Sequence, residues 1–358
     1  MRVWENNIRR VSPYVPGEQP NLPNMIKLNT NENPYPPAPG VRNLINHMDT
    51  DALRLYPDPD SRALIKELAN FYKVNEENVF VGVGSDDVIA MSFLTFFNSE
   101  KPILFPDITY SFYDVWANLY HIPFERPALD DNFRIRIADY YKENGGVVIA
   151  NPNAPTSIAE GLDVIEEILK HNQDVIVIVD EAYVDFGGES AIGLIPKYDN
   201  LLVIQTFSKS RSMAGMRIGY AIGNKVLIQA LNNVKSSYNS YTMNQVSILF
   251  GVEAVRDQNY FRECIEKIVE TREYVKDELK KLGFIFPDSK TNFLFITHKD
   301  IKAKDLFLAM REQGIFVRYF EKPRIDNFLR VTIGTNEQMQ SFIHFVKQFC
   351  EGYYKNNR

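Results

Sequence analysis

Residues 201–223 read LLVIQTFSKSRSMAGMRIGYAIG, and this stretch decides the fold class. The apolar run at 201–204 and the second apolar segment at 218–223 both have the composition of buried strands. Lys209 lies between them, directly after the first strand and among small hydroxyl residues. A lysine that loses water in such a place can form a Schiff base with a carbonyl compound. The alternative is a surface lysine in a loop between a strand and a helix.

The segments before this stretch repeat the order of strand, polar cluster and helix. Apolar runs at 79–83, 103–105, 147–150 and 175–179 are each followed by polar residues. Strands that are apolar throughout and alternate with helices indicate an α/β fold with a largely parallel sheet between layers of helices. Because ligands of such sheets bind at the carboxyl ends of the strands, we expect the polar clusters to face one crevice.

The chain is expected to have three parts. Residues 1–40 are rich in Pro and Asn and predict an extended arm. Residues 41–245 would form the large α/β domain. Residues 246–358 would form a smaller α/β domain, which receives part of the arm and contains a strand at 315–318. The arm cannot bury itself, so it is expected to cover the body of the protein or a partner subunit.

Composition argues against several classes of protein. The 358 residues carry a formal net charge of −6 and no long basic run, so we do not expect a nucleic acid partner. No run approaches the roughly 18 apolar residues of a membrane span, and the first residues lack the apolar core of a signal peptide. Two distant cysteines and scattered histidines predict no metal site and a reducing, cytoplasmic location.

The residues around Lys209 predict a phosphate site. The groups suited to a phosphate are Thr206, Ser208 and Arg217. A helix that begins at Gly84-Ser85-Asp86 would add free backbone N–H groups. Asp87 stands where a dinucleotide motif has its third glycine, which disfavours a nicotinamide cofactor. A lysine beside a phosphate site suggests pyridoxal phosphate (PLP).

Further residues fit the same cofactor. Asp180 ends the most apolar strand and suits a protonated pyridine nitrogen. Tyr183 is placed to reach the phenolic oxygen of the ring, and Tyr110 to stack on its face. Arg330 lies within an apolar strand and needs an anionic partner, such as a substrate carboxylate or phosphate, and Arg318 has a similar place. For each residue alone, a structural role is the alternative.

The motifs, in their order along the chain, resemble the histidinol-phosphate aminotransferase family, a branch of the fold type I PLP-dependent aminotransferases. The motifs that carry the resemblance are Asn31-Glu32-Asn33-Pro34-Tyr35, Tyr56-Pro57, Gly84-Ser85-Asp86, Tyr110, Asn151-Pro152-Asn153, Asp180-Glu181-Ala182-Tyr183, Thr206-Phe207-Ser208-Lys209 and Leu329-Arg330-Val331. The resemblance implies a homodimer that transfers the amino group of histidinol phosphate to 2-oxoglutarate in a ping-pong reaction.

The resemblance also implies roles for single residues. Lys209 would carry PLP and then transfer the proton. The residues expected to bind the cofactor are Ser85, Asp86, Tyr110, Asn153, Asp180, Tyr183, Thr206, Ser208 and Arg217, with Tyr56 reaching the phosphate in the partner subunit. The residues expected to meet the substrate are Tyr14, Asn31, Arg318 and Arg330.

The sequence departs from the family pattern at one functional position. The family usually has Asn-Pro-Asn-Asn-Pro-Thr-Gly, whereas this chain has Ala154 in place of the asparagine that hydrogen-bonds the ring oxygen, and Ser157 in place of the glycine. Alanine has no donor. Either Tyr183 alone holds the oxygen, or Asn153 moves in to help.

Three other functions stay open at this point. One is an aminotransferase for aromatic amino acids, and another is a threonine-phosphate decarboxylase of the same architecture. A non-catalytic binding module with this fold is the third, although Lys209, Asp180 and Tyr183 argue against it.

Overall fold

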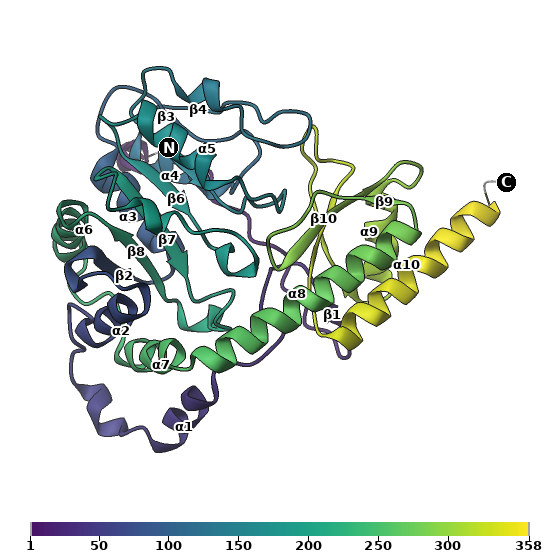
Figure 1. The fold of residues 1–358 in the computed structure, drawn as a ribbon, viewed down its shortest axis with the longest axis horizontal. Coiled ribbons are helices and arrows are strands. Elements are labelled where there is room, and N and C mark those ends of the chain that lie inside the picture. Colours follow the sequence, from purple (N-terminus) through teal and green to yellow (C-terminus); the bar gives the residue numbers. More distant parts are fainter. Residues whose placement is uncertain (1, 357–358) are drawn as a thin grey trace.

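The computed structural model describes residues 2–356, and its main feature is a seven-stranded sheet in the order β2-β8-β7-β6-β5-β3-β4 (Figure 1). Its strands are β2 (Val79–Gly82), β3 (Ile103–Leu104), β4 (Phe124–Glu125), β5 (Gly146–Ala150), β6 (Val177–Asp180), β7 (Leu201–Thr206) and β8 (Gly219–Gly223). β8 runs antiparallel to both its neighbours, and the strands from β7 to β4 are parallel. The largely parallel sheet predicted from the sequence is confirmed.

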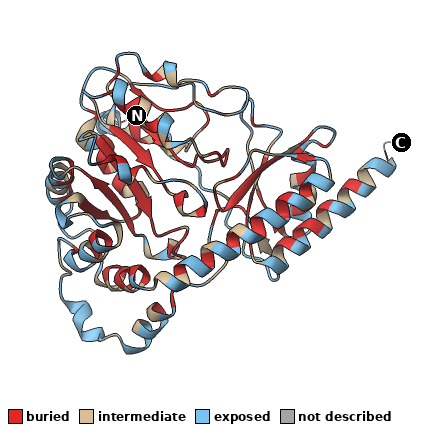
Figure 2. Ribbon diagram, in the orientation of Figure 1, coloured by how far each residue is buried: buried red, intermediate tan, exposed pale blue. Residues whose placement is uncertain are grey.

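Helices cover both faces of this sheet. The helices that contribute to the core on one face are α1 (Pro39–His47), α2 (Arg62–Tyr72), α5 (Leu162–His171) and α7 (Gln245–Arg256). Those on the other face are α3 (Ser85–Phe96), α4 (Phe112–Tyr120) and α6 (Lys225–Tyr238). In β6, Val177 and Val179 pack into the first core and Ile178 into the second, as the alternation of strand side chains requires. Figure 2 shows the central strands buried under these two layers.

A smaller antiparallel sheet in the order β12-β13-β10-β9 lies beside the large one (Figure 1). Its strands are β9 (Phe284–Ile285), β10 (Phe293–His298), β12 (Arg318–Tyr319) and β13 (Leu329–Thr332), and the helices next to it are α8 (Gln258–Lys281), α9 (Ala303–Glu312) and α10 (Asn336–Asn356). Their apolar residues form a core of their own, separate from the two cores of the large sheet. Within residues 2–356, no helix is long and apolar enough to cross a membrane.

Short 3-10 turns connect these elements. They are η1 (Val3–Asn7), η2 (Thr50–Arg54), η3 (Glu76–Asn78), η4 (Ile137–Tyr140), η5 (Val184–Phe186), η6 (Ala191–Leu194) and η7 (Ala214–Met216). The arm is otherwise extended, and its strand β1 (Ile26–Lys27) pairs in parallel with β11 (Ile315–Phe316) of the small domain. The single strand expected at 315–318 is therefore wrong: this segment divides between β11, which pairs with the arm, and β12, which pairs with β13.

The packing of α7 bears on where the two domains divide. Residues of α7 pack in the core of the large sheet, although the expected division at 245/246 gives them to the small domain. Asp257 separates α7 from α8 with non-helical dihedral angles, and its carboxylate accepts a hydrogen bond from the N–H of Tyr260 at 3.1 Å. We propose that the change of domain falls at Asp257.

Candidate functional site

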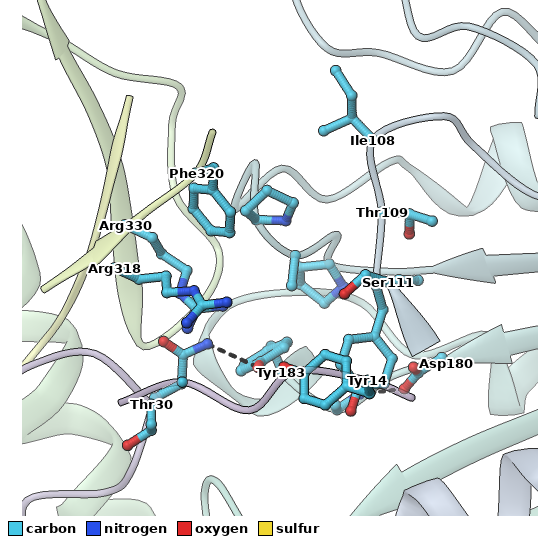
Figure 3. Close-up of a pocket in the computed structure, with 18 of the residues that line it drawn as sticks. Tyr14, Thr30, Ile108, Thr109, Ser111, Asp180, Tyr183, Arg318, Phe320 and Arg330 are labelled. Carbon is cyan, nitrogen blue, oxygen red and sulfur yellow. Dashed lines mark hydrogen bonds between the residues drawn. The ribbon is translucent and has the colours of Figure 1, made fainter. Parts of the chain in front are cut away.

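One cavity of about 670 Å³ lies where the large sheet, the small domain and the arm meet (Figure 3). The predicted site residues that line it are Tyr14, Asn31, Ser85, Asp86, Tyr110, Asp180, Tyr183, Thr206, Ser208, Lys209, Arg217, Arg318 and Arg330. They come from segments that are far apart in the sequence. The carboxyl ends of parallel strands meet here, as the sequence pattern predicted.

Lys209 follows the end of β7, and its amine reaches into this cavity. Its Nζ donates a hydrogen bond to the carbonyl of Thr30 at 3.3 Å and lies 5.7 Å from the centre of the Tyr183 ring. No carboxylate within residues 2–356 forms an ion pair with this amine. The lysine is thus held by the backbone of the arm and by an aromatic face, in a position to react with a ligand in the cavity.

Asp180, at the end of β6, is a buried carboxylate on the floor of the cavity. Its Oδ2 accepts a hydrogen bond from the hydroxyl of Tyr113 at 2.7 Å, and its Oδ1 accepts one from the N–H of Ala182 at 3.2 Å. Burial raises the pKa of Asp180 from 3.8 to about 6. A cation placed against this carboxylate would reverse that shift. Sequence reasoning missed Tyr113, because nothing in the sequence distinguishes it from a core aromatic residue.

Glu181, the next residue, faces the other side of the sheet and lies outside the cavity. It accepts hydrogen bonds from the hydroxyl of Ser190 at 2.6 Å and from the side-chain amide of Gln205 at 2.8 Å. Burial raises its pKa from 4.5 to about 7. The two adjacent carboxylates are therefore equally buried, but only Asp180 can meet a ligand.

The start of α3 and Arg217 form one corner of the cavity. Gly84 has φ +88°, and a Cβ there would lie 2.5 Å from Nη2 of Arg217, so the backbone must approach the guanidinium closely. Arg217 donates to the hydroxyl of Ser208 at 3.4 Å and to the carboxylate of Asp86 at 3.3 Å. The N–H groups of the first helical turn are free of helical partners. Such a corner suits a phosphate group.

Arg330 and Arg318 form the cationic wall on the side of the small domain. They are paired neighbours on β13 and β12, so two positive charges lie side by side (Figure 3). Arg330 donates to the carbonyl of Asn29 at 2.8 Å, while its buried Nε has no partner within the described chain. Burial lowers the pKa of Arg330. An anion at this wall would satisfy the unpaired Nε–H and offset the repulsion.

Two predicted site residues lie outside the cavity. The amide of Asn153 donates to the carbonyl of Ile108 and to the hydroxyl of Thr156, both at 2.9 Å. Both amide hydrogens are therefore used within the loops around Asn153. Ala154, and not Asn153, lines the cavity. The alternative in which Asn153 moves into the place of the missing asparagine is therefore not seen. Tyr56 is 81% exposed and stacks on Tyr241 with 4.6 Å between ring centres, away from the cavity of its own chain.

Arg324 at the rim is a second residue that sequence reasoning missed. From the loop between β12 and β13 it reaches across to the large domain. It donates to the carboxylate of Asp107 at 2.9 Å and to the carbonyls of Leu129 and Asp130 at 2.9 Å and 2.7 Å. These contacts hold the two domains together at the mouth of the cavity.

Comparisons with known proteins identify the family of this chain. Residues 23–346 match the model of the family described as aminotransferase class I and II. A histidinol-phosphate aminotransferase of Lactococcus lactis subsp. lactis (strain IL1403) is 52% identical over 354 residues, which cover 99% of this chain and 97% of that protein. One of Clostridium botulinum (strain Okra / Type B1) is 51% identical over 347 residues, which cover 97% and 98%.

Solved structures show the same fold. The structure of the histidinol-phosphate aminotransferase from Clostridium acetobutylicum superposes with a TM-score of 0.84 at 25% identity and covers 92% of this chain and 100% of that one. That from Sinorhizobium meliloti, in complex with pyridoxal-5'-phosphate, has a TM-score of 0.82 at 20% identity and covers 92% and 91%. This chain therefore belongs to the class I and II aminotransferases and, within them, to the histidinol-phosphate aminotransferase family.

Proposed function

We propose that this protein transfers the amino group of histidinol phosphate to 2-oxoglutarate with PLP as its cofactor. The observation that carries the proposal is that one cavity joins Lys209 to two cationic groups from different domains. Arg217 belongs to the large domain, whereas Arg318 and Arg330 belong to the small one. Two anions are thus accommodated, namely the phosphate of the cofactor and the charged end of the substrate. The 51–52% identical relatives, which are named for histidinol phosphate, support this substrate.

The residues of the cavity fit PLP. The corner at Gly84 and Arg217 would hold its phosphate, and Asp180, which has no ion-pair partner within the described chain, would meet its pyridine nitrogen. The bound cofactor would supply an electron-withdrawing ring that stabilises negative charge on the amine-bearing carbon of the substrate.

The protein's own residues then supply binding and proton transfer. The Nζ of Lys209, once neutral, would accept the proton from the amine-bearing carbon and return it on the cofactor side. Arg330, with Arg318, would bind the phosphate of histidinol phosphate in one half-reaction and the carboxylate of 2-oxoglutarate in the other. The contacts of Arg324 would keep the mouth of the cavity narrow and reduce the entry of water.

We also propose a homodimer in which Tyr56 reaches the cofactor phosphate in the partner subunit. The exposed apolar residues on the arm and around η2 support this assembly: Val3, Trp4, Ile8, Val11, Val15, Leu22, Ile45, Leu53 and Leu55. Exposed apolar residues gathered on neighbouring segments are typical of a protein–protein interface. A sedimentation measurement that gives a monomer mass at micromolar concentration would contradict the dimer. Both cysteines are free and buried, which supports the cytoplasmic location we propose.

An absorbance experiment tests the proposed reaction. The purified protein is incubated with PLP, and spectra are recorded after histidinol phosphate is added without any keto acid. We expect a yellow band that converts to the spectrum of the aminated cofactor. A band that responds only to phenylalanine, tyrosine or threonine phosphate would reject the substrate and keep the cofactor. A protein that forms no band with PLP would contradict the proposal.

A further inference from the structure

The replacement of a family asparagine by Ala154 raises the question of which group donates to the ring oxygen of the cofactor. This inference rests on the proposed function. Ala154 lines the cavity without a donor, and the amide of Asn153 is bound to the carbonyl of Ile108 and the hydroxyl of Thr156. The hydroxyl of Tyr183, which lines the same cavity, is the donor that remains for this oxygen.

Asn31 on the arm contacts this hydroxyl directly. Its Nδ2 donates a hydrogen bond to the Tyr183 hydroxyl oxygen at 2.9 Å, and Asn31 is only 1% exposed. Asn31 has φ +56°, a left-handed conformation that asparagine tolerates better than most residues. The arm thus places a side-chain amide against the tyrosine from outside the large domain.

Thr332 fixes which end of the amide faces the tyrosine. The backbone N–H of Asn31 donates to Oγ1 of Thr332 at 3.0 Å, which leaves the hydroxyl hydrogen of Thr332 to donate to Oδ1 of Asn31 at 3.1 Å. The amide oxygen therefore faces Thr332 and the amide nitrogen faces Tyr183. The carbonyl of Asn31 also accepts a hydrogen bond from Asn292 at 3.0 Å, which anchors the backbone independently of the side chain.

The direction of the Asn31 hydrogen bond has a consequence for the Tyr183 proton. A phenol oxygen that accepts from an amide keeps its own hydrogen free to donate elsewhere. Within residues 2–356 no acceptor takes this hydrogen, so it is available to a ligand in the cavity. Donation into the oxygen also polarises the O–H bond and makes it a stronger donor.

We propose that Asn31 is a positioning residue that directs and strengthens the Tyr183 hydroxyl as a donor to the ring oxygen of PLP, in compensation for Ala154. A donor to this oxygen withdraws negative charge from it. In the protein with PLP bound, the neighbouring imine nitrogen that would link the cofactor to Lys209 would then hold its proton less tightly. Loss of the donor must therefore move the absorbance transition of the bound cofactor to higher pH.

The test is the midpoint pH of this transition in four single variants of the full-length protein with PLP bound. Asn31→Ala keeps the Tyr183 hydroxyl but no longer directs it, so it should raise the midpoint by up to about one pH unit, the value of one typical hydrogen bond. Thr332→Val, nearly isosteric, releases the amide and should shift the midpoint in the same direction by less. Asn292→Ala loosens the same arm but keeps the amide, so it should leave the midpoint unchanged. Ala154→Asn restores the second donor and should lower the midpoint.

The effect of Asn31→Ala on the midpoint pH is then measured a second time, in protein that already carries Ala154→Asn. We expect a smaller rise there than in the natural background, because the restored asparagine supplies a second donor. Unchanged midpoints in both Asn31→Ala and Thr332→Val would overturn the inference, and so would an equal shift in Asn292→Ala. In each of these cases the natural protein still titrates with PLP bound, so the proposed function stands. If the natural protein forms no PLP band, the proposed function fails and this inference fails with it.

Discussion

The two halves of the cavity are built in different ways. On the side of the large domain, Asp180 ends β6 and Lys209 follows the end of β7. These two buried parallel strands pair in register, so a hydrogen-bonded ladder fixes Asp180 and the start of the turn that carries Lys209. On the opposite side, Arg318 and Arg330 lie on short strands of a second sheet, and Asn31 comes from the arm.

The polar groups of the two halves are satisfied to different degrees. Asp180 already has two hydrogen-bond donors in the protein, whereas the buried Nε of Arg330 has no partner in the described part of the chain. We call the side of Asp180 and Lys209 the cofactor half and the side of Arg318 and Arg330 the substrate half, following the proposed function, and we expect an anion to complete the substrate half. Each of the following experiments replaces one residue and measures how far turnover, substrate binding or cofactor binding changes.

Removal of the lysine amine should have the largest effect on turnover. Lys209→Ala should lower kcat by at least about 10³-fold, because the proton-transfer group is lost, while the phosphate corner still binds PLP. Steady-state kinetics and a PLP titration measure the two properties. Lys225→Ala is the matched control, since this exposed lysine follows β8 of the same sheet. Near-normal turnover in Lys209→Ala would contradict its role.

Removal of the arginine in the substrate half should weaken both half-reactions. Arg330→Ala should lower kcat/KM for histidinol phosphate and for 2-oxoglutarate by about 10- to 100-fold each. This range corresponds to the free energy of a charge-assisted hydrogen bond. Arg311→Ala, which removes an exposed arginine of the same domain, serves as the control. A loss confined to one of the two substrates would show that Arg330 does not bind both anions.

The adjacent carboxylates Asp180 and Glu181 allow a sharper comparison in the cofactor half. The pKa of Asp180 is raised from 3.8 to about 6 in the folded protein. Between these two pH values the folded protein therefore keeps a proton on Asp180 that the unfolded chain has lost. Cofactor-free protein should therefore lose stability as pH rises from about 4 to about 6. Asp180→Asn should reduce this loss and stabilise the cofactor-free protein at pH 7 by up to about 3 kcal/mol in denaturant unfolding, while the contribution of Glu181 remains.

Glu181→Gln should stabilise the cofactor-free protein in the same way, because burial also raises the pKa of Glu181, to about 7. The two variants should differ in their affinity for PLP. Asp180→Asn should weaken binding, since it removes the charge that meets the pyridine nitrogen, and Glu181→Gln should leave binding unchanged. Equal PLP affinities would contradict the assignment of Asp180.

The contact between the halves should give the smallest effect. Arg324→Ala removes the bonds to Asp107 and to two carbonyls, and should raise KM for both substrates by about 3- to 10-fold while it destabilises the protein by about 1 kcal/mol. Arg134→Ala, whose ion pair with Glu160 stays within the large domain, is the control. An equal rise of KM in both variants would show that the contacts of Arg324 between the two domains are not needed for substrate binding.

The sequence predicted residues at the ends of strands better than contacts between distant segments, for a physical reason. An apolar strand followed by a polar cluster is a local pattern, so Asp180 and Lys209 could be placed at one sheet edge before the structure was known. Contacts between distant segments leave no local pattern, which is why Tyr113 and Arg324 were missed. The same reason explains why residues 315–318 were expected to form a single strand. The division of this segment into β11 and β12 depends on pairing with the arm, which is distant in the sequence.

One pair of variants with two measurements tests most directly whether the halves are independent. PLP affinity and the saturation of the first half-reaction by histidinol phosphate are measured in Asp180→Asn and in Arg330→Ala. We expect Arg330→Ala to keep the PLP affinity of the natural protein and to require at least about 10-fold more histidinol phosphate. Asp180→Asn should bind PLP more weakly but saturate at a normal substrate concentration once loaded. A loss of PLP affinity in Arg330→Ala as large as that in Asp180→Asn would contradict the division of the cavity into a cofactor half and a substrate half.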